Sequence, residues 1–372
     1  MSDAGSTVLI AGATGVVGHA AVELFSAQQG WTTLALSRRR PELPADRGCL
    51  HLPIDLRDPE ACRRAIQTLP EVTHLVYAAL YEKPGLVQGW RERDQMAVNL
   101  AMLRNLLDPL AARSRSLRHV TLLQGTKAYG AHLHRIAIPA RERWPRDPHE
   151  NFYWLQEDYL RGLAARHGFD ITIFRPQIIF GDALGVAMNL TPIIGVYAAI
   201  CREEGLPFSF PGGPSYVLEA VDARLLARAI CWATEAPSAR NETFNITNGD
   251  VFVWRNVWPA IADELGVEPG PDRPLSLAQI LPAKAEIWDR VVAKHDLRRL
   301  TLGQILGESH HYADFCFAYG VQHPPPAVLV STIKLRQAGF GDCIDTEDMF
   351  RDWFRILAAR KIIPPTRRGV SR

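Results

Sequence analysis

Short apolar runs alternate with segments of helical periodicity through the first half of the chain. Six apolar runs are typical of buried strands, at 7–11, 32–37, 49–55, 73–79, 119–123 and 170–175. Four segments have apolar residues at helical spacing, at 16–28, 59–68, 95–113 and 154–167. Strands that alternate with helices are joined by right-handed crossovers and lie parallel. We therefore predict an α/β fold with a doubly wound parallel sheet.

The pattern becomes mixed beyond Phe180. Proline and glycine cluster at 207–214 and 268–274, and mostly helical segments follow. A length of 372 residues suits two lobes. We predict a sheet domain over residues 1–180 and a smaller, mostly helical lobe over 181–372. We expect the two to be interleaved, with some later segments returning to the sheet.

The composition of the chain bears on which kinds of molecule the protein binds. The 42 Lys and Arg residues nearly balance the 40 Asp and Glu residues, so charge gives no reason to expect nucleic acid or an anionic membrane. No uncharged apolar stretch approaches the roughly 18 to 20 residues of a membrane span. The beginning of the chain lacks a basic region of the secretory type, and the six cysteines form no Cys-x-x-Cys pair. We expect a cytoplasmic protein with reduced thiols, a small-molecule partner and no metal site.

Three glycines follow the first predicted strand at the start of the first predicted helix. Gly12, Gly15 and Gly18 form a G-x-x-G-x-x-G pattern. The first allows a tight turn, the second lets a pyrophosphate approach the backbone, and the third lets the helix pack on the strand. In this strand, turn and helix context the pattern predicts a Rossmann dinucleotide site. The alternative is a tight turn without a ligand.

The end of the second strand bears on the choice of cofactor. NAD sites usually have a carboxylate there, whereas this chain has Ser37, Arg38 and Arg39. Because guanidinium groups form charge-assisted, often bidentate bonds to phosphate, these residues favour the 2′-phosphate of NADPH. A solvated basic loop is the alternative. Asp55, at the end of the third strand, is placed either to accept from the adenine amino group or to act as a turn residue.

The glycine spacing, the IDLRD segment at 54–58 and Asn99 resemble the extended short-chain dehydrogenase/reductase superfamily. The usual chemistry of that superfamily needs Tyr-x-x-x-Lys, which puts a phenol and an ammonium on one helix face. None of the nine tyrosines has a lysine four residues later, and Tyr153 is followed at that spacing by Glu157. The ordinary catalytic motif is therefore missing.

Two other segments carry a candidate pair. LLQGTKAY at 122–129 places Lys127 in the loop after the fifth strand, and NFYWLQED at 151–158 places Tyr153 at the start of the next helix. Both should lie at the carboxyl ends of neighbouring strands, where open α/β sheets bind ligands. This combination resembles the progesterone 5β-reductase and iridoid synthase-like family of atypical short-chain reductases. The resemblance covers nearly the whole chain, including RPQIIFG at 175–181 and the segment 244–266.

The resemblance implies NADPH-dependent 1,4-reduction of enones or enals. Hydride delivered to the β-carbon makes an enolate, which a phenol can hydrogen-bond and a nearby ammonium can stabilise, so we assign these roles to Tyr153 and Lys127. Gln124 and Trp154 depart from the family pattern, and Trp154 is positioned to change the pocket wall. Taken singly, Tyr153 can be read as a packing aromatic and Lys127 as a surface lysine.

Further contacts complete the predicted site. We expect the cofactor also to contact Thr14, Val16, Leu56, Ala78, Ala79, Gln124, Pro176, Ile178 and Ile179. We expect the substrate to contact Tyr81 and Tyr129, and the resemblance implies that Met188 and Phe340 belong to the far wall of its pocket. An apolar wall of this kind suits an apolar enone better than a sugar nucleotide, although core packing is the alternative for each residue.

Three other functions stay open. They are a carbonyl reductase, a sugar-nucleotide epimerase or dehydratase of the same superfamily, and a non-catalytic NADP(H)-sensing regulator. The missing Tyr-x-x-x-Lys argues against the first two. A homodimer is a possible assembly.

Overall fold

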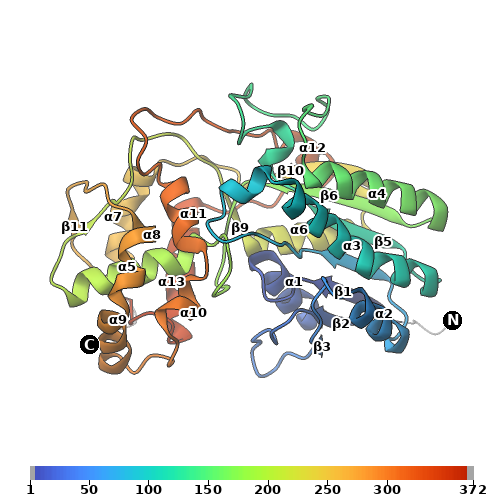
Figure 1. Cartoon of the computed structure of the whole chain (residues 1–372), viewed down its shortest axis with the longest axis horizontal. Helices are drawn as coiled ribbons and strands as arrows, with labels where there is room; N and C mark the ends of the chain where they lie inside the picture. Colours follow the sequence, from blue (N-terminus) through green and yellow to red (C-terminus); the bar gives the residue numbers. More distant parts are fainter. Residues whose placement is uncertain (1–4, 367–372) are drawn as a thin grey trace.

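A seven-stranded parallel sheet forms one half of the molecule (Figure 1). The structure is a computed structural model that describes residues 5–366. The strands run in the order β10-β6-β5-β4-β1-β2-β3. Their bounds are β1 (Ser6–Ala11), β2 (Trp31–Leu36), β3 (Leu50–Leu52), β4 (His74–Tyr77), β5 (His119–Leu123), β6 (Asp170–Pro176) and β10 (Glu242–Ile246). The predicted doubly wound α/β fold is confirmed.

The chain order of the strands reverses at β1, which pairs in parallel with β2 on one side and with β4 on the other. Strand β1 is apolar on both faces, as expected where helices cover a parallel sheet on both sides. Val8 and Ile10 point into one core cluster, whereas Leu9 and Ala11 point into another. The crevice at the carboxyl ends of β1 and its neighbours is where open α/β sheets bind ligands.

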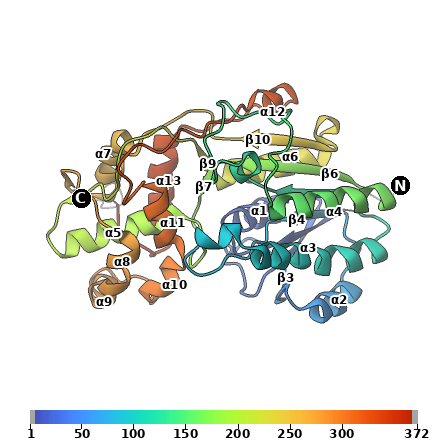
Figure 2. The same cartoon turned by 45° about the horizontal axis from the view of Figure 1, so that its top comes forward.

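Helices cover both faces of the sheet (Figure 2). One face carries α2 (Pro59–Thr68), α3 (Arg93–Arg113) and α4 (Phe152–His167), which pack side by side. The other face carries α1 (Val16–Ala27) and α6 (Ala223–Glu235). The short helix α12 (Ile333–Gln337) lies beside β10 at the edge of the sheet. Because α6, β10 and α12 all follow residue 180, later segments of the chain complete the sheet half.

The other half of the molecule is mostly helical. Its helices are α5 (Leu190–Glu203), α7 (Trp254–Leu265), α8 (Leu277–Ile280), α9 (Ala285–Lys294), α10 (Leu302–Leu306), α11 (Ser309–Cys316) and α13 (Thr346–Ala359). The central helix, α5, is buried along most of its length and contacts α7, α9, α10, α11 and α13. Aromatic residues fill the remaining space, and Phe180, Trp254 and Phe350 pack together there. We call this half the helical lobe.

The remaining elements are short. They are the strands β7 (Ile178–Phe180), β8 (Phe208–Ser209), β9 (Ala220–Asp222) and β11 (Pro269–Gly270), and the 3₁₀ turns η1 (Gln88–Arg91), η2 (Thr126–Tyr129), η3 (Pro237–Ala239) and η4 (Pro282–Lys284). Strand β7 follows β6 after a single residue and pairs with β9. This pairing carries the chain from the end of the sheet into the helical lobe.

Two element boundaries differ from the prediction in ways that matter. Strand β3 is shorter than the predicted run at 49–55, because Pro53 has no N–H to continue the ladder. Helix α4 begins at Phe152, and the Asn151 side chain caps it by accepting from the backbone N–H of Tyr153 (3.0 Å). Tyr153 therefore lies in the first turn of the helix.

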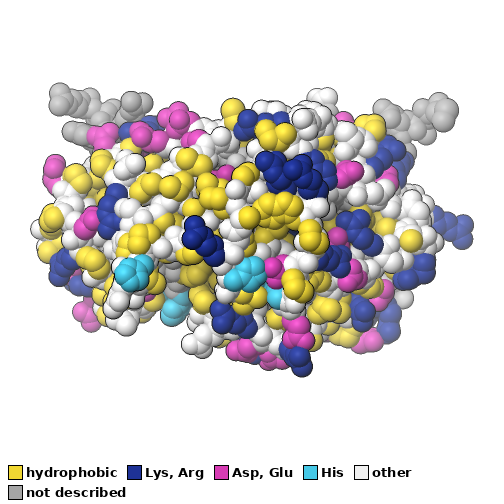
Figure 3. Space-filling model, turned by 90° about the horizontal axis from the view of Figure 1, so that it is seen from above, with side chains coloured by type: hydrophobic (Ala, Val, Ile, Leu, Met, Phe, Trp, Pro, Cys, Tyr) yellow, Lys and Arg dark blue, Asp and Glu magenta, His cyan; other side chains and the backbone are white. Residues whose placement is uncertain are grey.

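The surface mixes charges of both signs. Figure 3 shows acidic and basic side chains interspersed with hydrophobic ones on the face seen from above. Within residues 5–366, no helix combines the length and the apolar character that crossing a membrane requires.

Candidate active site

A cavity of about 1140 Å³ opens at the carboxyl ends of the central strands, between the sheet and the helical lobe. It brings together the glycine loop, the basic loop after β2 and the loops after β4, β5 and β6. The predicted cofactor residues that line it are Gly12, Thr14, Gly15, Val16, Ser37, Arg38, Arg39, Asp55, Leu56, Ala78, Ala79, Gln124, Pro176, Ile178 and Ile179. Tyr81, Lys127, Tyr153 and Met188 line the same cavity.

The glycine loop leaves no space for side chains. Gly12 has φ +83°, and a Cβ on it would lie 2.7 Å from the backbone of Ala78 and Ala79. A Cβ on Gly18 would lie 2.1 Å from the Gly12 carbonyl oxygen. Gly18 therefore allows α1 to pack on the loop but does not itself line the cavity. Gly15 is the N-cap residue of α1 and has no side chain to cap it, so the first amides of the helix suit an anionic group.

The loop after β2 lines the cavity, and hydrogen bonds hold two of its side chains. Ser37 Oγ donates to the Arg39 carbonyl (2.6 Å), and Arg39 Nη2 donates to the Leu184 carbonyl of the helical lobe (3.2 Å). Asp55 is held by the Arg57 guanidinium, whose hydrogen bonds lower the pKa of the carboxyl. Sequence reasoning missed Arg57 as a cavity residue.

Lys127 lies in η2 with its side chain almost enclosed. Its Nζ lies 3.9 Å from Glu82 Oε1 and 4.1 Å from the centre of the Trp90 ring. Burial lowers the pKa of the ammonium, and the Glu82 carboxylate opposes that shift. Lys127 is therefore a cavity residue and not a solvated surface lysine.

Tyr153 is held against the loop that carries Lys127. Its Oη lies 3.2 Å from the position of a Cβ built on Gly125, and Asn151 Nδ2 donates to the Lys127 carbonyl (3.2 Å). Burial and the negative charge of Glu82 raise the pKa of the phenol, and Arg175 opposes this shift. The phenol is thus a protonated hydrogen-bond donor near neutral pH, in the same cavity as the Lys127 ammonium.

Gln124, one of the two departures from the family pattern, joins a buried polar network behind the cavity. It donates to Glu157 Oε2 (2.9 Å) and accepts from Arg175 Nε (2.8 Å). Glu157 also accepts from Arg161 (2.9 Å), and its pKa is lowered because these hydrogen bonds outweigh the effect of burial. Glu157 is engaged by cations and an amide, which agrees with a supporting role at α4 over a role in acid/base chemistry.

Comparison with known proteins identifies the family. The NAD dependent epimerase/dehydratase family matches residues 8–247. The 3-oxo-Delta(4,5)-steroid 5-beta-reductase of Arabidopsis thaliana is 30% identical, and the alignment covers 96% of this chain and 93% of that protein. The (S)-8-oxocitronellyl enol synthase of Antirrhinum majus is also 30% identical, with the same coverage. The chain belongs to the NAD dependent epimerase/dehydratase family. Within that family it is a member of the progesterone 5β-reductase and iridoid synthase-like group, which confirms the predicted resemblance.

Two solved structures of UDP-glucose 4-epimerases share the fold. The UDP-glucose 4-epimerase of Thermus thermophilus in complex with NAD has a TM-score of 0.63 at 20% identity and covers 94% of this chain and 99% of its own. The UDP-glucose 4-epimerase of Bifidobacterium longum in complex with NAD+ and UDP has a TM-score of 0.64 at 14% identity, with coverage of 96% and 100%. At these identities the comparison bears on the architecture alone.

Two predicted substrate residues lie elsewhere, which corrects the expectation for them. Tyr129 turns away from the cavity because its hydroxyl donates to Asn245 Oδ1 on β10 (2.7 Å). Phe340 follows α12 along the outer edge of the sheet and packs against Trp232, with ring centres 5.7 Å apart. Trp154 does not reach the cavity wall either, since its ring lies beneath the guanidinium groups of Arg146 and Arg175.

Several cavity residues were not predicted from the sequence. Glu82 lies in the loop after β4, directly after Tyr81. A carboxylate in the loop after a strand next to β1 is a sequence signal for a site residue, because ligands bind at that edge of the sheet. Trp90 in η1 and Phe315 in α11 meet edge to face with ring centres 5.3 Å apart. No local pattern joins η1 to α11, because the two segments come from different lobes.

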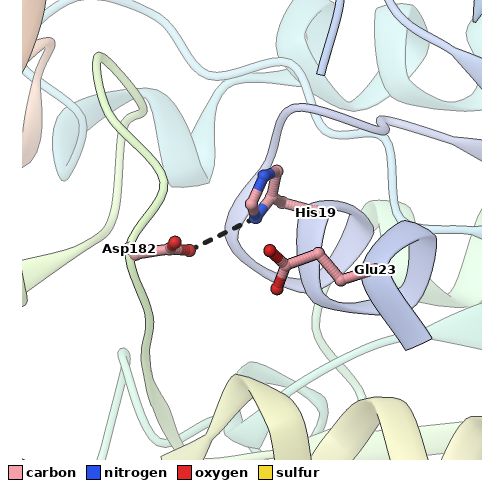
Figure 4. A group of neighbouring side chains, drawn as sticks. All are labelled: His19, Glu23 and Asp182. Carbon is pink, nitrogen blue, oxygen red and sulfur yellow. Dashed lines mark ion pairs between the residues drawn. The ribbon is translucent and has the colours of Figure 1, made fainter. Parts of the chain in front are cut away.

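A cluster of ionisable groups lies where α1 meets the helical lobe (Figure 4). His19 and Glu23 on α1 face Asp182, and these three residues have the donor atoms of a metal site. His19 Nε2 lies 2.8 Å from the Glu42 carbonyl and Nδ1 lies 3.2 Å from Asp182 Oδ1. The Arg360 guanidinium also pairs with Asp182. Burial lowers the pKa of His19, but Asp182, Glu23 and the Glu42 carbonyl together raise it more. The cluster forms an ion-pair network that joins the lobes.

Proposed function

We propose that the protein reduces the C=C bond of α,β-unsaturated carbonyl compounds with NADPH, by delivery of hydride to the β-carbon. The observation that carries this proposal is that Lys127 and Tyr153 both line the cavity that contains the glycine loop. The chain lacks Tyr-x-x-x-Lys and yet presents a phenol and an ammonium to one cavity. Its relative from Arabidopsis thaliana is named as a reductase of a 3-oxo-Delta(4,5)-steroid, which is itself an enone.

The residues of the chain act on the oxygen of the substrate. When bound, the nicotinamide cofactor supplies the hydride. As negative charge develops on the carbonyl oxygen, the Tyr153 phenol donates a hydrogen bond to it and the Lys127 ammonium stabilises the enolate. Solvent can return the proton to the α-carbon, so this scheme needs no dedicated acid. Placing donors where charge develops lowers the barrier because they are already oriented.

The choice of NADPH rests on the loop after β2. Arg38 and Arg39 both line the cavity, and Ser37 provides a hydroxyl beside them. Positive charge together with the absence of a carboxylate at the end of this strand favours a 2′-phosphate over free ribose hydroxyls.

The substrate end of the cavity suits a small apolar enone. Its walls carry many apolar side chains, among them Met188, Leu218, Phe315, Val321 and Val328. Apolar walls with a few convergent polar groups are typical of small-molecule sites. The helical lobe supplies most of this apolar surface, so it serves as the substrate lobe.

A labelling experiment tests the reaction. We expect 2-cyclohexen-1-one incubated with C4-deuterated NADPH to give cyclohexanone with deuterium at the β-carbon. Deuterium on a carbinol carbon would overturn the proposal in favour of carbonyl reduction.

Substitution tests the catalytic pair. Tyr153→Phe should lower kcat by about 10² to 10³, the typical effect of removing one oxyanion donor. Binding of NADPH should be retained, because the phenol acts on the substrate oxygen. Tyr129→Phe is the matched control, since its hydroxyl bonds to Asn245 outside the cavity, and its turnover should equal that of the wild type. Equal turnover in Tyr153→Phe would remove the pair from the mechanism.

A further inference from the structure

Glu82 is a buried carboxyl beside the candidate catalytic pair that the proposed mechanism does not use. It belongs to the loop after β4, and its side chain is only 3% exposed. The residue lines the cavity with Lys127 and Tyr153. We propose that Glu82 is a positioning residue that holds Lys127 in place and keeps it protonated, so that the ammonium can face the enolate oxygen. This inference rests on the proposed function.

Helix α3 fixes the loop that carries Glu82. The Asn99 side chain bonds to both backbone groups of Tyr81, accepting from its N–H and donating to its carbonyl (2.9 Å each). Gln95 Nε2 donates to Glu82 Oε2 (2.7 Å), and Gln95 Oε1 accepts from the backbone N–H of Lys83 (3.0 Å). Two buried amides of α3 therefore set the direction of the carboxyl, and its Oε1 faces Lys127 Nζ at 3.9 Å.

The helical lobe closes over the same group. Trp90 lies on Lys127, and Phe315 of α11 packs against Trp90. The backbone N–H of Gly85 donates to Glu308 Oε2, which ties the loop to the helical lobe (3.1 Å). In Figure 1 the cyan segment that contains η1 lies between the two halves. The Lys127 side chain is 16% exposed, and an ammonium this far buried is disfavoured without a counter-ion.

The other ionisable groups around Lys127 do not replace Glu82. Among residues 5–366, Glu82 provides the only carboxylate within ion-pair distance of Lys127. His132 lies beyond η2, and burial together with Lys127 lowers its pKa to about 4, so it is neutral at pH 7. Tyr153 on α4 and Tyr312 on α11 line the same cavity, and Arg175 on β6 acts electrostatically on Tyr153. None of these groups replaces Glu82 as the counter-ion of Lys127. Burial raises the pKa of the Glu82 carboxyl, and Lys127 and the hydrogen bond from Gln95 oppose that shift.

The decisive variant is Glu82→Gln, which keeps the size of the side chain and an acceptor for Gln95 but removes the charge. An opposite charge at this range shifts a pKa by about 1 to 3 units. We expect the alkaline limb of the kcat/KM profile to move to lower pH by about that amount, with the rate at pH 6 changing only a few-fold. Glu82→Asp should restore the limb toward that of the wild type. An unchanged limb in Glu82→Gln would overturn the proposal.

Two controls separate a positioning role from a structural one. Glu92→Gln alters an exposed carboxylate farther along the same loop and should keep the wild-type profile and Tm. In a Lys127→Met background, Glu82→Gln should produce no further shift, because no ammonium remains for it to act on. A shift of equal size in that background would show that Glu82 acts independently of Lys127.

A direct titration keeps this test independent of the substrate. Carbon-13 NMR of lysine labelled at Cε, with the Lys127 signal assigned by Lys127→Met, reports its pKa without turnover. We expect that pKa to fall in Glu82→Gln. If the wild type fails to reduce enones, the proposed function fails, while a lowered Lys127 pKa would still support the pairing. An unchanged pKa would overturn the pairing itself.

Discussion

The basic loop after β2 leads to a quantitative prediction for cofactor choice, with Arg38→Ala as the perturbation. Arg39 donates to the Leu184 carbonyl and Arg57 is held by Asp55, so both guanidinium groups already have partners. Arg38 lines the cavity, and no carboxylate of the described chain lies within ion-pair distance of it. It is therefore the guanidinium most available to a 2′-phosphate.

The magnitude follows from the kind of bond that is lost. A hydrogen bond to a charged group contributes about 1.5 to 3 kcal/mol. Because Arg38 is exposed, solvent screening favours the lower part of this range, about 1.5 to 2 kcal/mol. Since about 1.4 kcal/mol is a factor of ten in affinity, the Kd for NADPH should rise about 10- to 30-fold. The Kd for NADH, which lacks the phosphate, should stay within about twofold of the wild-type value.

Isothermal titration calorimetry with both cofactors checks this prediction. Arg40→Ala is the matched control, because Arg40 lies two residues after Arg38, is exposed and does not line the cavity. Its affinities for both cofactors should match those of the wild type. Equal weakening of NADPH and NADH binding in Arg38→Ala, or no change in either, would refute the assignment of Arg38 to the 2′-phosphate.

Two further predictions concern stability. The pKa of His19 is raised in the folded state, so its contribution is fully present below its unfolded pKa near 6.5 and is lost as the pH rises through the folded pKa. The free energy of unfolding, measured with urea from pH 6 to 9, should show this loss. If its pH dependence were the same in His19→Gln as in the wild type, the prediction would be contradicted. Phe340→Ala removes a buried ring outside the cavity and should cost about 3 to 5 kcal/mol of unfolding free energy while kcat and KM stay unchanged. A raised KM in a folded Phe340→Ala protein would return Phe340 to the substrate wall.

The parts of the site that the sequence predicted depend on backbone topology. The glycine loop is a local property of the chain, because the turn and the helix–strand packing leave no space for a Cβ at Gly12 or Gly18. Lys127 and Tyr153 line the same cavity because Lys127 lies just beyond the carboxyl end of β5 and Tyr153 lies at the start of α4, the helix that follows. Parallel strands bring all such positions to one edge of the sheet.

The parts that the sequence did not predict depend on the direction of side chains and on contacts between lobes. Tyr129 is two residues from Lys127, but the 3₁₀ turn sends its ring toward Asn245 on β10. Phe340 lies where it does because α12 binds the sheet edge, with Lys334 Nζ donating to the Thr243 carbonyl (2.9 Å). Periodicity within one element does not specify either direction, since both are set by β10, a strand far from Tyr129 and from Phe340 along the chain.

The pairing of Lys127 with Glu82 points to a role in function and not in stability. Removing two charges from water costs free energy that a separation of 3.9 Å regains only in part, so the pair is weak as a source of stability. Apolar residues of similar volume would pack this position at least as well. The chain nevertheless keeps an ammonium under Trp90 and directs a carboxyl at it with the amide of Gln95. A cation that lines the same cavity as a protonated phenol would stabilise a negative charge that develops on a bound oxygen, and the enolate of the proposed reaction carries such a charge.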